Sequence, residues 1–362
     1  MIRRFIRYYK PHTVLFIFDM LASLLVSVIG LSYSMITNEM MSSWIEEGQD
    51  GINKIVFFGA LLLGLYFVRM LLRFFIQYYG HVIGVKMQAQ MRNDLFNKLQ
   101  KLPYKYYDNH ETGKIMSRMT NDLMDVSELA HHGPENLFIC GIMVVGSFIY
   151  LLSINVYLTL IVFACVPVLV TISLLLRKRM TNAFMESRKS IAVINAALES
   201  SISGIRVTKA FTNSKKEEEK FEDGNQQFVN ARKKSYKAMG LFHSSTSFVT
   251  DVFNVIVLIA GGIFMLLDKI DAAGYTTFII SINLFISPVN TLIGFVEQLQ
   301  NGMTGFKRFV EIMEEDEEAE KPDASELEVT KGEINFNNVS FSYNESKEVL
   351  KNVTLNIKPK EI

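Results

Sequence analysis

The chain has 362 residues, of which 49% are hydrophobic, and its 37 basic residues balance its 37 acidic residues to a net charge of zero. A balanced charge excludes a global electrostatic attraction to nucleic acid. Because the apolar residues are concentrated in six blocks rather than scattered at the period of a helix or a strand, the sequence favours a polytopic membrane protein over a soluble one.

The first twelve residues are rich in basic and aromatic side chains, which are typical of a short elbow helix lying at a membrane interface. Six spans follow, each able to cross a hydrocarbon core of about 30 Å as a helix. We place these spans at about residues 13–36, 55–79, 137–153, 156–176, 246–267 and 275–300. Only Ile154 and Asn155 separate the third span from the fourth, so these two should form a tight helical hairpin. Pro167 and Pro288 lie within spans and should kink them, because proline removes a backbone hydrogen bond.

The loops differ in charge, and this difference predicts the orientation. Lysine and arginine gather before the first span and in segments 80–136 and 177–245, whereas segment 37–54 is mainly acidic. Since basic loops stay in the cytoplasm, both termini of this multi-pass cell-membrane protein should be cytoplasmic. Segment 177–245 is too long for an irregular loop, so we expect spans two to five to continue into the cytosol as helical arms. An arm of about 30 residues would reach ~45 Å at 1.5 Å per residue.

A short crosspiece should close each of the two pairs of arms. The first lies in the polar stretch 102–122, where Asp108 and Asn109 are good helix-capping residues. Gly113 should provide the sharp reversal of the chain there. The second crosspiece lies in 201–211, where Gly204 should break the arm.

The C-terminal part of the chain changes character. The membrane domain, residues 13–310, is followed by an acidic segment, 311–332, which we interpret as a solvated linker. From residue 333 apolar and polar residues alternate with the period of a strand, and 344–347 should form a turn. Residues 333–362 therefore begin a β-rich domain, although about thirty residues cannot bury a core alone.

This order of features resembles the half-transporters of the ATP-binding cassette (ABC) exporter family, in which six membrane helices precede a nucleotide-binding domain. The C-terminal strands are similar to the start of that domain. The first crosspiece resembles the family's first intracellular loop at Leu102, Pro103, Tyr106, Tyr107, Asp108, Gly113, Ser117, Arg118, Asn121 and Asp122. The second crosspiece resembles the second intracellular loop at Glu199, Gly204, Ile205, Arg206, Val207, Lys209, Ala210 and Phe211.

The resemblance implies that the crosspieces are coupling helices seated in grooves of nucleotide-binding domains, the second on the domain of a partner subunit. It also implies that Tyr343 stacks on the adenine ring of ATP, for which an aromatic face is chemically suited. ATP and Mg²⁺ would be the cofactors. The partners would be a second half-transporter, in a homodimer or a heterodimer, together with nucleotide-binding domains, the lipid bilayer and an exported substrate.

The sequence lacks the motifs that bind the phosphates of ATP. Gly332 is its last glycine, so no G-x-x-x-x-G-K-[ST] loop can follow, and Pro359 stands near the position where the family commonly has glycine. We expect this chain alone to have no catalytic residues and not to hydrolyse ATP. Our preferred hypothesis is the membrane subunit of an ATP-driven exporter of drugs, lipids or peptides that works by alternating access. The alternative is a truncated, non-catalytic membrane partner or regulator of a complete half-transporter.

Charged residues within spans are costly to bury and are candidates for function. Asp19, Arg69 and Asp251 are predicted either to line a wet cavity or to form structural ion pairs, while Arg73 can extend its charge to the interface. Gly80 and Gly84 form a G-x-x-x-G pattern that is consistent with close helix packing.

His131 and His132, flanked by Glu128 and Glu135, suggest a metal site. Adjacent histidines should nevertheless point to different sides of a helix. We therefore expect a loop-top or capping role for them and no metal site.

Overall fold

The computed structural model describes residues 1–318, 323–326, 332–342 and 348–359. The chain divides into two compact units, Met1–Glu315 and Asp316–Ile362. The first unit consists of helices joined by short connections, and the second contains a β-hairpin.

Six candidate membrane spans occur among the described residues, which confirms the predicted polytopic helical class. The long helices of the first unit are α2 (Thr13–Ser42), α3 (Gln49–Leu99), α6 (Leu123–Ile154), α8 (Val166–Ser203), α10 (Ser214–Leu266) and α11 (Ala272–Met313). Its shorter elements are α1 (Ile2–Arg7), η1 (Lys10–His12), η2 (Trp44–Glu47), α4 (Tyr104–Asn109), α5 (Thr112–Ser117), the π-helical turn η3 (Arg118–Asp122), α7 (Val156–Ala164) and α9 (Ile205–Ala210).

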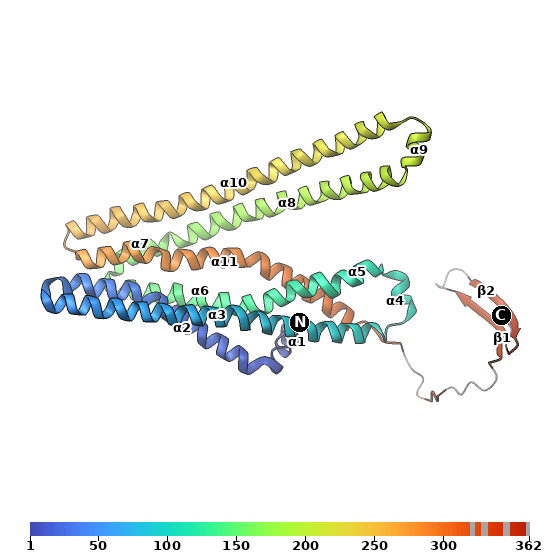
Figure 1. The fold of residues 1–362 in the computed structure, drawn as a ribbon, viewed down its shortest axis with the longest axis horizontal. Helices are drawn as coiled ribbons and strands as arrows, with labels where there is room; N and C mark the ends of the chain where they lie inside the picture. The colour runs from blue at the N-terminus through green and yellow to red at the C-terminus, as the bar shows by residue number, and fades with distance from the viewer. Residues whose placement is uncertain (319–322, 327–331, 343–347, 360–362) are drawn as a thin grey trace. The chain divides into compact units, whose positions relative to one another are not determined.

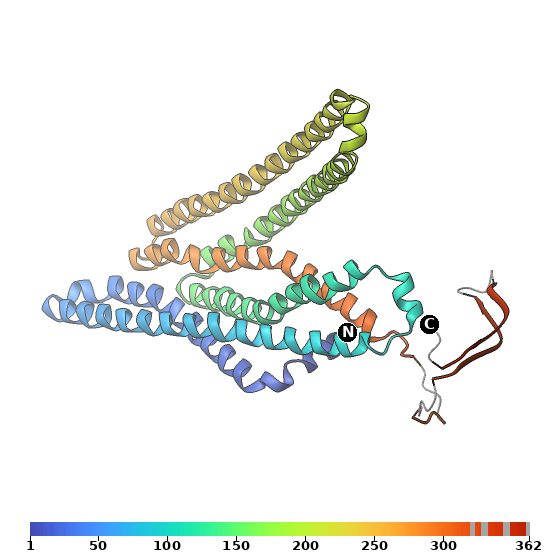
Figure 2. The same ribbon diagram turned by 45° about the vertical axis from the view of Figure 1, so that its right-hand side comes forward.

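The predicted helical arms are present. Helices α8 and α10 lie side by side and are joined by α9, and both diverge from α3, α6 and α11 toward that end (Figures 1 and 2). The hydroxyl of Ser235 on α10 donates to the carbonyl of Ala183 on α8 at 2.8 Å. The guanidinium carbon of Arg232 also lies 5.4 Å from the ring centre of Phe184. These contacts hold the two arms together as one hairpin.

Glycines bring α11 against α6. A Cβ atom at Gly302 would lie 2.5 Å from the Cβ of Leu129, and one at Gly305 would lie 2.6 Å from the carbonyl oxygen of Asp122. Any larger residue would push the helices apart, because these neighbouring atoms are close to the backbone and cannot move away. A buried hydrophobic cluster that includes Leu123, Phe306 and Phe309 lies beside this contact.

Glycines also allow α3 and α6 to approach each other closely. These are Gly80 and Gly84, whose spacing suggested close helix packing. A Cβ atom at Gly80 would lie 2.8 Å from Cδ2 of His131, and one at Gly84 would lie 2.8 Å from Oγ of Ser127. The sequence pattern therefore marks a true helix contact in this chain.

The tight hairpin between the third and fourth spans is also confirmed. Helix α6 ends at Ile154 and α7 begins at Val156, with Asn155 between them in an extended conformation. The Asn155 side chain accepts a hydrogen bond from the backbone amide of Leu158 and donates one to the carbonyl of Lys269, each at 2.9 Å. The asparagine therefore caps α7 and fixes the neighbouring turn.

The prolines affect their helices in different ways. The fourth span is interrupted at Cys165, which separates α7 from α8 just before Pro167. Pro288 instead lies inside α11, and the helix continues beyond it to Met313. A third proline, Pro134, lies inside α6 and cannot donate to the carbonyl of Ala130 four residues earlier. The hydroxyl of Tyr9 donates to that carbonyl and replaces the missing hydrogen bond.

The second unit contains two antiparallel strands, β1 (Ile334–Ser342) and β2 (Glu348–Ile357). Their register pairs Ile334 with Ile357 and Phe336 with Leu355, and both strands lie where the alternating pattern predicted strands. The apolar side chains remain largely exposed, because a two-stranded hairpin has no opposing layer on which to bury them.

Candidate functional site

The first tip is formed by α4, which lies across the ends of α3 and α5 (Figure 1). The chain reverses at His110 and Glu111, both in extended conformations. Gly113 lies inside α5, so the prediction that it makes the reversal is wrong. Asp108 and Asn109 end α4 rather than capping the start of a helix, and the Asn109 amide donates to the carbonyl of Lys105 at 2.9 Å.

Aromatic residues hold this tip in place. Tyr106 is buried and stacks on the ring of His110 at a centroid distance of 4.2 Å. Burial disfavours the charged phenolate and raises the pKa of Tyr106. The Tyr107 hydroxyl donates to the carbonyl of Leu99 at the end of α3. Tyr104, in contrast, is 83% exposed and points its large ring away from the protein.

The last four residues predicted for this site lie after α4, at the end of α5 and in η3, on the segment that returns to α6. They are Ser117, Arg118, Asn121 and Asp122. The Asn121 amide donates to the hydroxyl of Ser117 at 3.3 Å. Two ion pairs join this segment to α11: Arg118 with Glu311 at 3.9 Å, and Asp122 with Arg308 at 3.2 Å. The Asp122 side chain is only 12% exposed, and its pairing with Arg308 joins this segment to the C-terminal part of α11.

The second tip is α9. Gly204 separates α8 from α9, as predicted, and Thr212 adopts a left-handed φ of 51° just after α9 ends. Arg206 and Lys209 are exposed, and Phe211 is 78% exposed. Large apolar side chains therefore protrude at both tips, far from the apolar centres of the spans.

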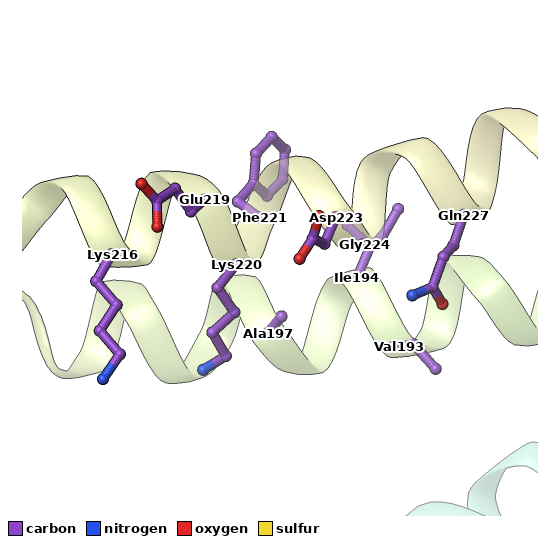
Figure 3. Close-up of a pocket in the computed structure, with 10 residues that line it drawn as sticks. All are labelled: Val193, Ile194, Ala197, Lys216, Glu219, Lys220, Phe221, Asp223, Gly224 and Gln227. Atoms are coloured by element: carbon purple, nitrogen blue, oxygen red, sulfur yellow. The ribbon is translucent and has the colours of Figure 1, made fainter.

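A hollow of about 420 Å³ lies between the arms near the second tip (Figure 3). Helix α8 contributes Val193, Ile194 and Ala197, and α10 contributes charged residues of both signs. The charged residues are Lys216, Glu219, Lys220 and Asp223. These lining residues include no cysteine, serine or histidine.

A second cavity, of about 520 Å³, lies between α2, α3, α6 and α11. Of the three residues predicted to line a cavity, the structure places Arg69 here. Asp19 is buried on α2, and its Oδ1 has no hydrogen-bond partner among the described residues. Asp251 is exposed on α10. Arg73 also lines this cavity, together with Arg69. From the sequence we expected Arg73 to extend its charge to the membrane interface and did not predict a place in the cavity.

Further polar residues of this cavity were missed from the sequence, among them Gln77, Glu135 and Asn283. Another missed pair is Arg177 with Glu297, which joins α8 to α11 at 2.9 Å. Their positions in the sequence gave no indication of which side of each helix these residues occupy.

The two adjacent histidines, His131 and His132, lie inside α6, more than two turns after its start, so the expected loop-top or capping role is wrong. Their ring centres are 3.7 Å apart, and the ring of His81 on α3 lies 4.0 Å from that of His131. The predicted adenine-stacking residue, Tyr343, lies outside the described residues.

Comparison with known proteins agrees with this architecture. The family model described as the ABC transporter transmembrane region matches residues 16–289. The uncharacterized ABC transporter ATP-binding protein YwjA of Bacillus subtilis is 34% identical, over all of this chain and 63% of its own length.

Two more distant relatives carry more specific names. A fatty acid ABC transporter ATP-binding/permease protein of Mycobacterium bovis is 27% identical over 76% of this chain and 43% of its own length. An ATP-dependent lipid A-core flippase of Thiobacillus denitrificans is 23% identical over 99% of this chain and 62% of its own length. The chain thus spans less than two thirds of each of these relatives. From the matched span and the helical architecture, we conclude that the chain belongs to the ABC transporter family and contains its transmembrane region.

Proposed function

We propose that this chain is the membrane subunit of an ATP-driven exporter that works by alternating access. The observation that carries the proposal is the pair of tips, each of which exposes a large aromatic side chain at the end of a helical arm. Tyr104 on α4 is 83% exposed and Phe211 after α9 is 78% exposed. Exposed aromatic groups of this kind are typical anchors of a protein interface.

In this proposal the tips dock on nucleotide-binding domains, α4 on one domain and α9 on the domain of a second half-transporter. Asp108, Gly113, Ser117, Arg118, Asn121 and Asp122 belong to the first coupling region, and Gly204, Arg206, Lys209 and Phe211 belong to the second. The ion pairs of Arg118 and Asp122 with α11 would carry a displacement of the first tip into the sixth span. This requires both tips and both termini to be cytoplasmic, as the basic loops favour.

ATP, with Mg²⁺ as its counter-ion, would supply the free energy for the conformational cycle. The residues that the structure describes do not form a glycine and lysine cradle for phosphates, so we assign no step of ATP hydrolysis to them. Tyr343 remains a proposed adenine-stacking residue. Two relatives are named for fatty acid and lipid A-core, and a lipid belongs to the substrate classes that we propose.

The proposal is tested by removing the aromatic anchors in the complete gene product, reconstituted in lipid. Tyr104→Ala and Phe211→Ala should each lower ATP hydrolysis by at least tenfold, because the tips would no longer engage the nucleotide-binding domains. The midpoint of thermal unfolding should not change, since neither side chain is buried.

Leu266→Ala is the matched control, because Leu266 is 82% exposed at the opposite end of α10 and should be neutral. Hydrolysis that is unchanged in both tip variants would refute the coupling role. A complete gene product that neither binds nor hydrolyses ATP, even in the unaltered sequence, would favour the alternative of a non-catalytic partner.

A further inference from the structure

Three histidines and a glutamate from two helices meet where α3 packs against α6. His81 comes from α3, and Glu128, His131 and His132 come from α6. One potential ligand atom from each residue lies within 4.8 Å of those of the other three. Imidazole nitrogens and a carboxylate oxygen are ligands that Zn²⁺ and related divalent ions bind readily.

The shorter hydrogen bond of His81 favours a tautomer that suits metal binding. Its Nδ1 lies 2.6 Å from the backbone carbonyl of Gln77. A carbonyl oxygen can only accept a hydrogen bond, so Nδ1 carries the proton and Nε2 keeps a free lone pair. Metal-bound histidines commonly donate their other ring N–H to a carbonyl or a carboxylate in this way.

His131 gives a second, independent indication of a ligand. Its side chain is only 2% exposed, yet its Nε2 has no hydrogen-bond partner among the described residues. Buried polar atoms are rarely left unpaired, because burial without a partner costs free energy. Gly80 allows this ring to reach α3, since a Cβ at that position would lie only 2.8 Å from Cδ2 of His131.

Two carboxylates make the cluster electrostatically suitable for a cation. Glu128 Oε2 lies 3.6 Å from Nε2 of His132. Glu135 Oε2 lies 3.7 Å from Nε2 of His131 and 3.5 Å from Nδ1 of His132, and it too is buried without a hydrogen-bond partner among the described residues. Glu135 can therefore orient the imidazole of His132 through Nδ1 from outside the ligand set, and its negative charge near Nε2 of His131 favours a cation there.

We propose that His81, Glu128, His131 and His132 bind one divalent transition-metal ion of the Zn²⁺ type. Four ligands of these types complete a tetrahedral shell, in which ligand atoms lie about 3.4 Å apart when the bonds are about 2.05 Å long. The four candidate ligand atoms now lie within 4.8 Å of one another, so binding would draw them closer together. Because the ligands fill the shell and come from two helices, the ion would fasten α3 to α6 rather than activate water.

The test uses the complete gene product in lipid nanodiscs, prepared without a polyhistidine tag and stripped of metal with a chelator. After equilibrium dialysis against Zn²⁺, metal analysis should find one more ion per chain in the unaltered protein than in the His81→Ala variant. Affinity should fall at least tenfold in this variant. Co²⁺ should give the visible absorption of a tetrahedral complex only in the unaltered protein.

Glu128→Gln provides a second variant that preserves side-chain shape, and it should also weaken binding at least tenfold. His243→Ala is the matched control, because His243 is exposed on α10 and away from the cluster. Zn²⁺ should raise the midpoint of thermal unfolding in the unaltered protein and in His243→Ala, but not in His81→Ala. Equal Zn²⁺ content in the unaltered, His81→Ala and Glu128→Gln proteins, or no retained Zn²⁺ in any of them, would overturn the proposal.

Discussion

Small residues determine how closely the helices of the first unit approach one another, and α3 offers a direct comparison. A Cβ atom at Gly84 would lie 2.8 Å from Oγ and 2.9 Å from the carbonyl oxygen of Ser127 on α6. A Cβ atom at Gly64 on the same helix would meet nothing within 4 Å. The two glycines therefore have the same helical backbone and different surroundings.

Alanine should have different effects on stability at these two positions. Gly64→Ala should leave the free energy of unfolding unchanged or raise it by up to about 1 kcal/mol, because alanine restricts the unfolded chain. Gly84→Ala should lower the free energy of unfolding by about 1–3 kcal/mol, because the backbone oxygen of Ser127 cannot move away. Thermal unfolding in nanodiscs measures both, and a Gly84→Ala protein as stable as Gly64→Ala would contradict the close packing of α3 on α6.

The sequence located charged residues within spans but could not say which way they face. A shift of one residue rotates a side chain by about 100° around a helix, and long apolar blocks do not fix that rotation. Arg69 consequently lines the membrane cavity, whereas Asp19 is buried on α2 and Asp251 is exposed on α10. His81 could not be connected with His131 at all, because they lie far apart in the chain and meet only through helix packing.

At the scale of elements, the α8–α10 hairpin depends on small buried serines between its two helices. Ser187 on α8 and Ser235 on α10 are fully buried, and Ser235 donates to the carbonyl of Ala183. A larger residue at position 235 would be forced into the adjacent helix, since close-packed interiors do not accommodate added volume without strain.

Ser235→Leu should therefore separate the arms and speed amide hydrogen exchange in their outer halves, because packing protects these backbone amides from local opening. Ser244→Leu is the control: Ser244 is exposed on the same helix and its hydroxyl bonds within α10. Exchange measured by mass spectrometry should change only in the first variant. Equal exchange in the two variants would show that the arms do not depend on this contact.

Element types and lengths were predictable because they depend on composition and period, whereas local turns were not. The arms, the Asn155 hairpin and both strands follow the sequence patterns. The reversal at the first tip instead uses extended backbone at His110 and Glu111, which ordinary residues can adopt, and leaves Gly113 in a helix. A glycine permits a reversal but does not require one, so this prediction failed.

At the scale of the whole membrane unit, the helices form two groups. One group is the α8–α9–α10 hairpin, which ends in the second tip, and the other includes α3, α6 and α11 and ends in the first tip (Figures 1 and 2). The Arg177–Glu297 ion pair joins the groups at the inner part of the arms. In the proposed mechanism each group moves as a rigid body, so closure at the tips changes the cavity within the spans.

The distance between the two tips during ATP turnover tests this central claim most directly. Spin labels would be attached through Lys105→Cys on α4 and Lys215→Cys on α10, two exposed sites, after replacement of Cys140 and Cys165 by alanine. Labelled chains would be diluted with unlabelled chains so that distances within one chain dominate. Pulsed electron–electron double resonance should report a different tip-to-tip distance with trapped nucleotide than without nucleotide, because the two groups rotate relative to each other. An identical distance distribution in both states, in a protein shown to hydrolyse ATP, would contradict the account.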